Sequence, residues 1–285
     1  MRTARSAAEL REALEPAHRT GATIGLVPTM GAIHDGHLSL LRAAREHCES
    51  VVMSLFVNPS QFGPGEDLDA YPRDLARDSE LAADAGVDLV YAPTTEEMYP
   101  EGFATWVDVG GGLSEVLDGA PDRRGASHFR AVATVVAKLL NLVRPQVAFF
   151  GQKDAQQVIV IRRMVRDLDF GVAIEVLPTV REPDGLAMSS RNAYLDAEER
   201  RRASALSRAL DAARAIAEQG ETRAASALVA AAAELEREGI EPEYLEARDA
   251  ESLEPVESFN GRPVLVAVAA RVGKARLIDN VVIGG

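Results

Sequence analysis

The sequence has a single cysteine, Cys48, among 285 residues, so no disulfide can form within the chain. A lone thiol is typical of a protein from a reducing compartment. No run of about 18 apolar residues occurs, so we predict no membrane span. Charged residues interrupt residues 1–20, which predict an amphipathic helix and not a signal peptide. These shortages favour a cytoplasmic location.

Positive charge is also scarce. The chain has 31 Lys and Arg residues against 44 Asp and Glu, a formal net charge of -13 at pH 7. Nucleic acids and anionic membranes bind basic surfaces, so we expect neither as a partner. Only three of the 31 cationic residues are lysines, namely Lys138, Lys153 and Lys274. The composition is otherwise globular, with 47% hydrophobic residues, and the length suits one large domain or two smaller ones.

Strand and helix patterns alternate through the first part of the chain. Apolar runs predict buried strands at residues 22–27, 51–57, 87–91, 147–150 and 172–177. Apolar spacing predicts helices near 38–44, over 72–85 with Pro72 in its first turn, over 129–143 and over 154–168. Strands alternating with helices predict an α/β fold, a parallel sheet covered by helices on both faces.

The pattern changes after about residue 177. Residues 196–218 and 221–238 predict two Ala-rich helices, and 243–248, 264–270 and 275–283 predict strands. Helices followed by clustered strands favour a separate small α+β domain. Pro178, Pro183 and Gly185 interrupt the chain at the junction. We therefore expect two domains, residues 1–178 and 179–285.

The strongest local signal is PTMGAIHDGH, residues 28–37, between the first predicted strand and the next helix. In open α/β sheets, ligands bind beyond the carboxyl ends of strands, and a helix N-terminus suits phosphate. Gly31 and Gly36 permit a tight turn and close approach of the backbone to a ligand.

His34 and His37 fit three interpretations: capping residues, a metal pair, or the HxGH motif of nucleotidyl transferases. In that motif, imidazoles donate hydrogen bonds to phosphate oxygens as charge builds at the α-phosphorus. We favour the HxGH motif, because the sequence offers no obvious third metal ligand and no helical His-Glu-x-x-His pattern.

Three further polar segments add to this signal. Asn58 and Gln61 follow the second strand in NPSQF, and their amides suit hydroxyl and carboxylate groups. GQKDAQQ, residues 151–157, opens a helix and contains Lys153, whose compact cation suits phosphate. MSSRN, residues 188–192, offers hydroxyls and a guanidinium for a triphosphate. Each segment alone also fits a turn or a helix cap, but together they favour a nucleotide site without a P-loop or dinucleotide fingerprint.

These segments resemble the pantothenate synthetase family, the pantoate–β-alanine ligases. The resemblance rests on PTMGAIHDGH, FVNPSQF, DAYPRD, FFGQKDAQQ, PTVREPDGLAMSSRN and the terminal RLIDN, in the family's order. It implies a Rossmann-like domain, a smaller C-terminal lid domain and a homodimer. It also implies a two-step reaction. Pantoate attacks the α-phosphorus of Mg²⁺-bound ATP to give pantoyl adenylate and pyrophosphate. The amine of β-alanine then displaces AMP to give pantothenate, a coenzyme A precursor.

The resemblance further implies roles for individual residues. The implied catalytic residues are His34, His37, Lys153, Ser189 and Arg191. The implied ATP-binding residues are Met30, Gly31, His34, Gly36, His37, Gly151, Lys153, Asp154, Val180, Met188, Ser189, Ser190 and Arg191. Asn58, Gln61 and Gln157 would bind pantoate. No protein ligand for Mg²⁺ and no base for the β-alanine amine are identified, and we expect the acidic stretch 66–69 to be a solvated loop.

Three positions depart from the family's pattern. Gln152 stands where a glutamate is usual and Ala131 where a glycine is usual. The spacing from Arg124 to His128 is one residue longer than usual and lacks a proline, so we assign no role to Arg124.

Two other functions fit the residues alone. One is another HxGH transferase, such as a cytidylyltransferase, which nucleotide competition would separate because the ligase should prefer ATP over CTP. The other is a nucleotide-binding regulator without activity. The joint presence of His34, His37, Lys153 and Arg191 speaks against a regulator.

Overall fold

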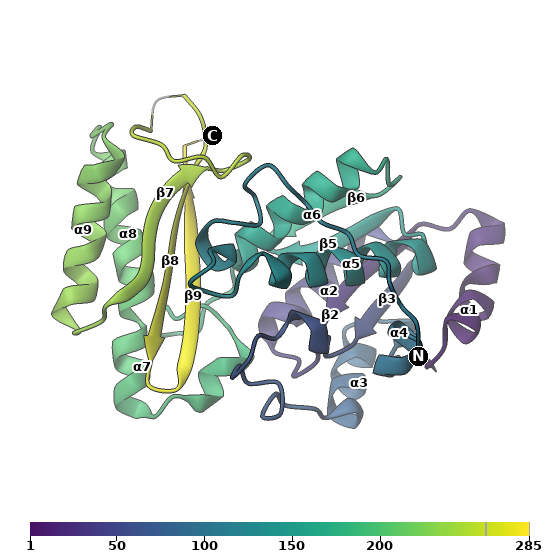
Figure 1. Ribbon diagram of the computed structural model, residues 1–285. Helices are drawn as coiled ribbons and strands as arrows, with labels where there is room; N and C mark the ends of the chain where they lie inside the picture. Colours follow the sequence, from purple (N-terminus) through teal and green to yellow (C-terminus); the bar gives the residue numbers. More distant parts are fainter. Residues whose placement is uncertain (260, 285) are drawn as a thin grey trace. The chain divides into compact units, whose positions relative to one another are not determined.

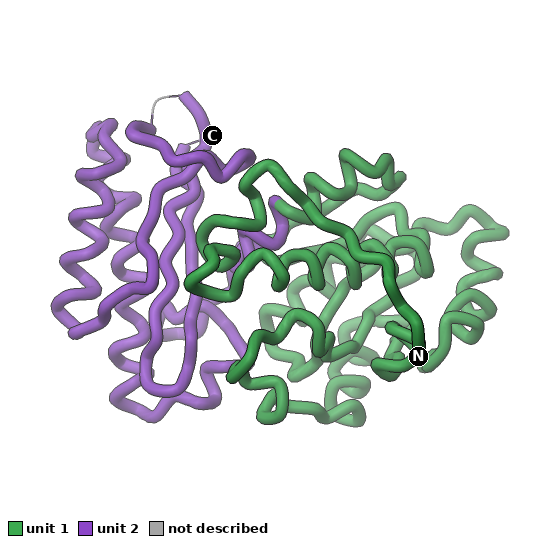
Figure 2. The backbone as a smooth tube through the Cα atoms, viewed as in Figure 1, with its two compact units in different colours: residues 1–151, 160–177 green, residues 152–159, 178–285 purple. Residues whose placement is uncertain are grey.

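The computed structural model describes residues 1–259 and 261–284. The chain divides into two compact units (Figure 2). The first comprises residues 1–151 and 160–177, and the second comprises residues 152–159 and 178–285. The short segment 152–159 thus groups with the second unit, although its neighbours on both sides in the sequence belong to the first. The expected domain boundary at 178/179 stays a prediction.

The first unit contains a six-stranded parallel sheet with the order β1-β4-β3-β2-β5-β6 (Figure 1). Its strands are β1 (Arg2–Ala4), β2 (Ile24–Thr29), β3 (Ser50–Leu55), β4 (Leu89–Tyr91), β5 (Val147–Gly151) and β6 (Ala173–Leu177). The α-helices between them are α1 (Ala7–Thr20), α2 (Asp35–His47), α3 (Leu75–Asp84), α4 (Thr95–Met98), α5 (Ala126–Val143) and α6 (Ala155–Asp167). Short 3-10 turns along this part of the chain are η1 (Pro59–Gln61), η2 (Leu117–Gly119) and η3 (Gln152–Asp154), of which η3 belongs to the second unit. The predicted α/β class with a Rossmann-like sheet is confirmed.

The strand order places a switch point beside β2. The chain proceeds from β2 to β3 on one side, whereas β5 and β6 follow on the other. Doubly wound sheets bind ligands beyond the carboxyl ends of the strands at such a point. The segments after β2 and β3 therefore start at the edge of the sheet where a ligand is expected.

Helix α2 covers one face of this sheet through its apolar stripe. Leu40, Leu41 and Ala44 recur at helical spacing and are buried. They share one core cluster with strand residues Val27, Val51, Met53 and Phe149 and with Ala82 of α3. This packing holds α2 against the sheet, and the HxGH motif lies at the start of this helix.

Several predicted boundaries are corrected. Strand β2 continues through Pro28 to Thr29, because the fixed φ of proline is compatible with extended backbone. Helix α3 begins only at Leu75, because Asp74 accepts a hydrogen bond from the Arg77 amide and caps it, so Pro72 precedes the helix. The N-terminal helix is confirmed only from residue 7, and the short strand β1 comes before it by pairing with β4. A strand of three residues that forms by pairing with a strand far along the chain has no apolar pattern long enough to predict it.

Among the described residues, α5 alone is long and apolar enough to cross a membrane by length and composition. However, 67% of that 18-residue stretch is buried inside the protein. The core helix of a globular domain passes the same test. The expected helix 129–143 is confirmed and begins three residues earlier, at Ala126.

The second unit contains an antiparallel sheet, β7 (Pro242–Asp249), β8 (Val264–Val272) and β9 (Ala275–Ile283). Its helices are η4 (Ser190–Tyr194), α7 (Ala197–Ala203), α8 (Ala205–Glu218) and α9 (Ala224–Arg237), and α8 and α9 pack beside the sheet (Figure 1). Small side chains such as Ala209 and Ala227 meet Val266 and Val268 of β8 in one buried core. The Ala-rich segments thus form closely packed helices, and the first predicted helix is divided at Ser204.

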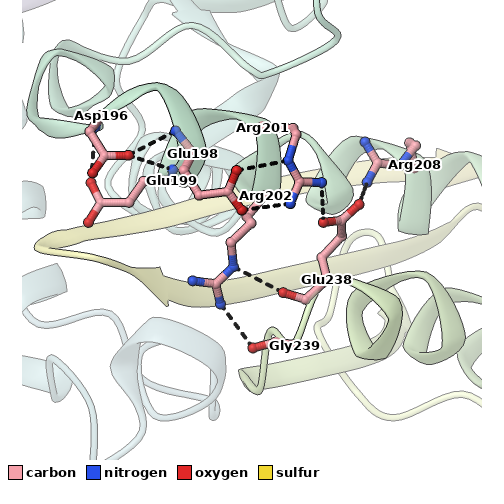
Figure 3. A network of polar contacts seen from close by, with 8 residues as sticks. All are labelled: Asp196, Glu198, Glu199, Arg201, Arg202, Arg208, Glu238 and Gly239. Atoms are coloured by element: carbon pink, nitrogen blue, oxygen red, sulfur yellow. Dashed lines mark hydrogen bonds and ion pairs between the residues drawn. The ribbon is translucent and has the colours of Figure 1, made fainter.

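Ion pairs connect α7 and α8 to the C-terminal end of α9 (Figure 3). Arg201 bridges Glu198 and Glu238, each at 2.7 Å, and Arg208 pairs with Glu238 at 2.9 Å. Asp196 caps α7 by accepting hydrogen bonds from two backbone amides. An exposed pair stabilises a protein by less than about 1 kcal/mol, so this network, which joins α7 and α8 to the end of α9, adds little to stability.

Candidate active site

A buried carboxylate holds the turn between β2 and α2. Gly31 and Ala32 both have positive φ, 88° and 51°. Asp78 of α3, which is 2% exposed, accepts hydrogen bonds from the amides of Ala32 (2.9 Å) and Ile33 (2.8 Å). A Cβ on Gly31 would lie 2.8 Å from Asp78 Oδ2, so the close approach of the carboxylate requires a glycine.

His34 and His37 lie together at the start of α2. His34 caps the helix, because its Nδ1 accepts a hydrogen bond from the Gly36 amide at 3.2 Å, and His37 Nδ1 accepts from the His34 amide at 3.4 Å. The ring centroids are 4.1 Å apart. Since both Nδ1 atoms accept, the proton of each neutral ring is on Nε2, which becomes the donor. The capping interpretation is therefore confirmed, and it fixes the tautomer that a phosphate-binding role needs.

Asn58 organises the turn after β3. Its side chain is 1% exposed. Its Oδ1 accepts hydrogen bonds from Ser60 Oγ (2.7 Å) and Tyr99 Oη (3.0 Å), and its Nδ2 donates to Gln61 Oε1 at 3.3 Å. Gln61 Nε2 in turn donates to Met30 Sδ at 3.0 Å. The structure thus joins the segments after β2 and β3 at the edge of the sheet.

The Ala131 departure leaves this turn intact. Asn58 Nδ2 also donates to the Ala131 carbonyl at 3.4 Å. A backbone carbonyl is present in glycine and alanine alike, so exchanging one for the other preserves the contact.

Arg124 forms an ion pair with the segment 61–66. Its guanidinium binds both carboxylate oxygens of Glu66, at 2.9 and 2.7 Å, and Nη1 donates to His128 Nε2 at 3.1 Å. His128 Nδ1 then donates to the Gln61 carbonyl at 2.8 Å. Burial alone would raise the pKa of Glu66, but the hydrogen bonds and charge of Arg124 outweigh it and lower that pKa. The expected solvated loop is therefore wrong for Glu66, whose side chain is only 22% exposed.

His128 should make stability depend on pH. Burial, and secondly the charge of Arg124, lower its pKa from 6.5 to about 4. The folded chain then binds fewer protons than the unfolded chain between these values, so the free energy of unfolding falls as the pH falls through this window. Between about pH 7 and pH 5 we expect a loss of at most about 2 kcal/mol from this group.

The His128→Asn variant removes the titration and keeps an amide donor near Gln61. Urea unfolding at the two pH values should show a smaller loss for His128→Asn than for the unmodified chain. The exposed His47→Asn variant serves as the control. Equal losses in His128→Asn and the unmodified chain would contradict the expectation.

The second unit carries the lysine of the GQKDAQQ segment. In η3, Lys153 Nζ lies 3.6 Å from Asp154 Oδ1. The lysine side chain is 21% exposed and the aspartate 46% exposed. Gln157 follows in the first turns of α6 and is half-buried. Gly151, the residue before η3, ends β5 in the first unit.

The remaining predicted ATP-binding residues of this unit lie in one local hairpin. The amide of Met188 donates to the carbonyl of Val180 at 2.9 Å, which closes the hairpin. Ser189 follows and accepts a hydrogen bond from the Arg191 amide at 3.3 Å, so the capping interpretation of this serine is confirmed. Ser190 begins η4. Residues 180 and 188–191 are therefore held close together by one backbone hydrogen bond and one bond to the Ser189 hydroxyl.

Asp78 was not among the residues predicted for the site. Asp78 stands four residues before the buried Ala82 of α3, so helical spacing places both on one face. A charged residue on the buried face of a helix is uncommon, and this feature of the sequence could have indicated a special role for Asp78. Among residues 1–259 and 261–284, no group of three or more His, Cys, Asp and Glu side chains could hold a metal.

Comparison with known proteins shows to which family the chain belongs. Residues 2–282 match the family model described as pantoate-beta-alanine ligase. The chain belongs to the pantoate–β-alanine ligase family. It is an enzyme of pantothenate biosynthesis that ligates pantoate and β-alanine in an ATP-dependent reaction.

The similarity extends over the full length. Pantothenate synthetase of Moorella thermoacetica is 55% identical over 279 residues, which cover 97% of this chain and 96% of that protein. A crystal structure of pantothenate synthetase from Thermus thermophilus superposes with a TM-score of 0.92 at 52% identity, covering 99% of each chain. The ligase from Francisella tularensis, solved in complex with beta-gamma ATP and β-alanine, has a TM-score of 0.80 at 31% identity, covering 99% of this chain and 97% of that one.

Proposed function

We propose that this ligase works through a pantoyl adenylate and releases AMP and pyrophosphate. The observation that carries the proposal is the histidine pair, whose Nδ1 atoms accept backbone hydrogen bonds and whose Nε2 atoms therefore carry the protons. Two such donors beside a helix N-terminus match the negative charge that develops on phosphate oxygens during attack at the α-phosphorus.

Amide side chains supply the pantoate side of the proposal. Gln61, fixed by Asn58 and Met30, would hold the hydroxyl and carboxylate groups of pantoate, and Asn58 would act by keeping Gln61 in place. Gly31 and Gly36 would let the backbone approach the phosphates of ATP. Gln157 would add a further amide for pantoate.

Further groups for ATP come from residues 151–154, 180 and 188–191. Lys153 would bind phosphate in place of its present neighbour Asp154, which would turn to the ribose together with the backbone of Gly151. Ser189, Ser190 and Arg191 would bind phosphate oxygens with hydroxyl and guanidinium donors. In the same hairpin, Val180 and Met188 would lie against the adenine and its neighbouring atoms.

We further propose that Mg²⁺ enters as part of the substrate Mg²⁺-ATP, that the protein acts in the cytoplasm, and that it is a homodimer. The first is supported by the family resemblance. The cytoplasmic location is supported by the single cysteine of the chain, and the homodimer by the family resemblance. Sedimentation equilibrium should return twice the chain mass of 30.5 kDa.

An isotope experiment tests the proposed intermediate. Pantoate labelled with ¹⁸O in its carboxylate is incubated with Mg²⁺-ATP and β-alanine. Attack at the α-phosphorus leaves one labelled oxygen on AMP, because the amine later breaks the bond between the acyl carbon and that oxygen. Mass spectrometry should find ¹⁸O in AMP. Label in orthophosphate, together with ADP, would instead indicate an acyl phosphate.

A further inference from the structure

The terminal RLIDN motif has no role so far, although its last two residues are buried. Asp279 is 3% exposed and Asn280 is 5% exposed, and both lie on β9. Successive side chains of a strand point to opposite faces of the sheet. Leu277 and Val281 belong to the core of the second unit, so Asp279 lies on the core face and Asn280 on the opposite face.

Asn280 makes three hydrogen bonds with the segment that contains Lys153. Its Nδ2 donates to the carbonyls of Gln152 (3.0 Å) and Lys153 (2.9 Å), and its Oδ1 accepts from Gln152 Nε2 at 2.9 Å. Because both backbone groups are acceptors, only the nitrogen of Asn280 can face them, which fixes the orientation of the amide. These bonds also explain why segment 152–159 groups with the second unit.

The neighbouring Asp279 fixes the strand on its other face. It forms a two-point ion pair with Arg181, with distances of 2.6 and 3.1 Å, and accepts a further hydrogen bond from the Asn280 amide at 2.8 Å. Arg181 follows Val180 in the hairpin that the hydrogen bond between Met188 and Val180 closes. Strand β9 is thus tied to η3 on one face and to the hairpin on the other.

We propose that Asn280 is a positioning residue for Lys153. By holding the carbonyls of residues 152 and 153, it sets where the η3 backbone places the lysine ammonium for ATP phosphate. This inference rests on the phosphate-binding role of Lys153 in the proposed function. It also gives Gln152 a role, since its side-chain amide completes the set of bonds to Asn280.

A double-mutant cycle separates positioning from general stabilisation. Pantoate-dependent pyrophosphate exchange gives kcat/KM for ATP in the full-length chain, in Asn280→Ala, in Lys153→Met and in the double variant. Asn280→Ala should lower kcat/KM by about tenfold or more, since small misplacements of a binding group are costly. In the Lys153→Met background the same change should have an effect of less than about twofold.

A second residue of β9 provides the control. Val282 lies on the same face of β9 as Asn280 and is 41% exposed, so Val282→Thr should leave kcat/KM unchanged. Equal effects of Asn280→Ala in both backgrounds would mean a structural role only and would overturn the inference alone. An unchanged kcat/KM in Lys153→Met would overturn both the inference and the proposed role of Lys153. If Asn280→Ala does not fold, Asn280→Ser retains a hydroxyl donor and replaces it in the cycle.

Discussion

Replacing His34 or His37 with alanine should lower kcat for pantoate adenylation by about 10²–10³. This is the usual effect of removing one preorganised donor to a developing oxyanion. Each imidazole donates from Nε2, because its Nδ1 already accepts a backbone hydrogen bond. Pyrophosphate exchange into ATP measures the adenylation step without the later attack by β-alanine.

His34→Asn separates catalysis from capping at the same position. Asparagine is among the best N-cap residues and can accept the hydrogen bond from the Gly36 amide. His34→Ala should therefore lose about 1 kcal/mol of stability, whereas His34→Asn should retain most of it. We expect both variants to lose kcat to a similar extent. A His34→Asn enzyme with unchanged kcat would show that the histidine serves only as a cap.

Replacing Asp78 with asparagine should damage both stability and adenylation. The carboxylate accepts hydrogen bonds from the amides of Ala32 and Ile33 while it is 2% exposed. An asparagine supplies one acceptor and turns its NH₂ group toward the other amide. Losing one charged hydrogen bond and leaving a buried amide without an acceptor should cost about 2–4 kcal/mol. Without both hydrogen bonds, the turn should place His34 less well, because this residue follows the turn directly. We therefore expect kcat to fall as well.

The measurement must distinguish a misplaced turn from a smaller folded fraction. Urea unfolding gives the loss of stability, and sucrose restores the folded fraction because it is excluded from protein surfaces. We expect kcat of Asp78→Asn to remain low in sucrose. Glu80→Gln, an exposed carboxylate of the same helix, should change neither quantity. Full recovery of kcat in sucrose would reduce Asp78 to a purely stabilising role.

The α/β class with a parallel sheet followed from alternating apolar runs and helical stripes. Buried parallel strands such as β2 and β3 are apolar along most of their length, so they are visible in the sequence. Strand β1 was not predicted, because three residues gain their structure only by pairing with β4. The start of α3 was misplaced because Pro72 and Asp74 both suit a helix start, and the hydrogen bond to Arg77 decides between them.

The motifs containing His34, Gln61, Lys153 and Ser189 could be predicted because their residue types and spacing are local. The residues that hold them could not. Asp78, Arg124 and Asn280 act through contacts with residues 46, 58 and 128 positions away in the chain. The sequence next to each residue does not predict such long-range contacts. For Arg124, the altered spacing before His128 also argued against a role.

The sequence by itself determined the α/β class, the order of the polar motifs and, by resemblance, the family. Those features depend on local periodicity and on side-chain chemistry, which can be read one segment at a time. Only the tertiary structure decided which nitrogen of each histidine is the donor, because hydrogen bonds from folded backbone amides set the tautomer. It likewise decided which backbone groups Asp78 and Asn280 contact. Their carboxylate and amide groups acquire partners only when distant segments meet in a dry interior, where an unsatisfied polar group is costly.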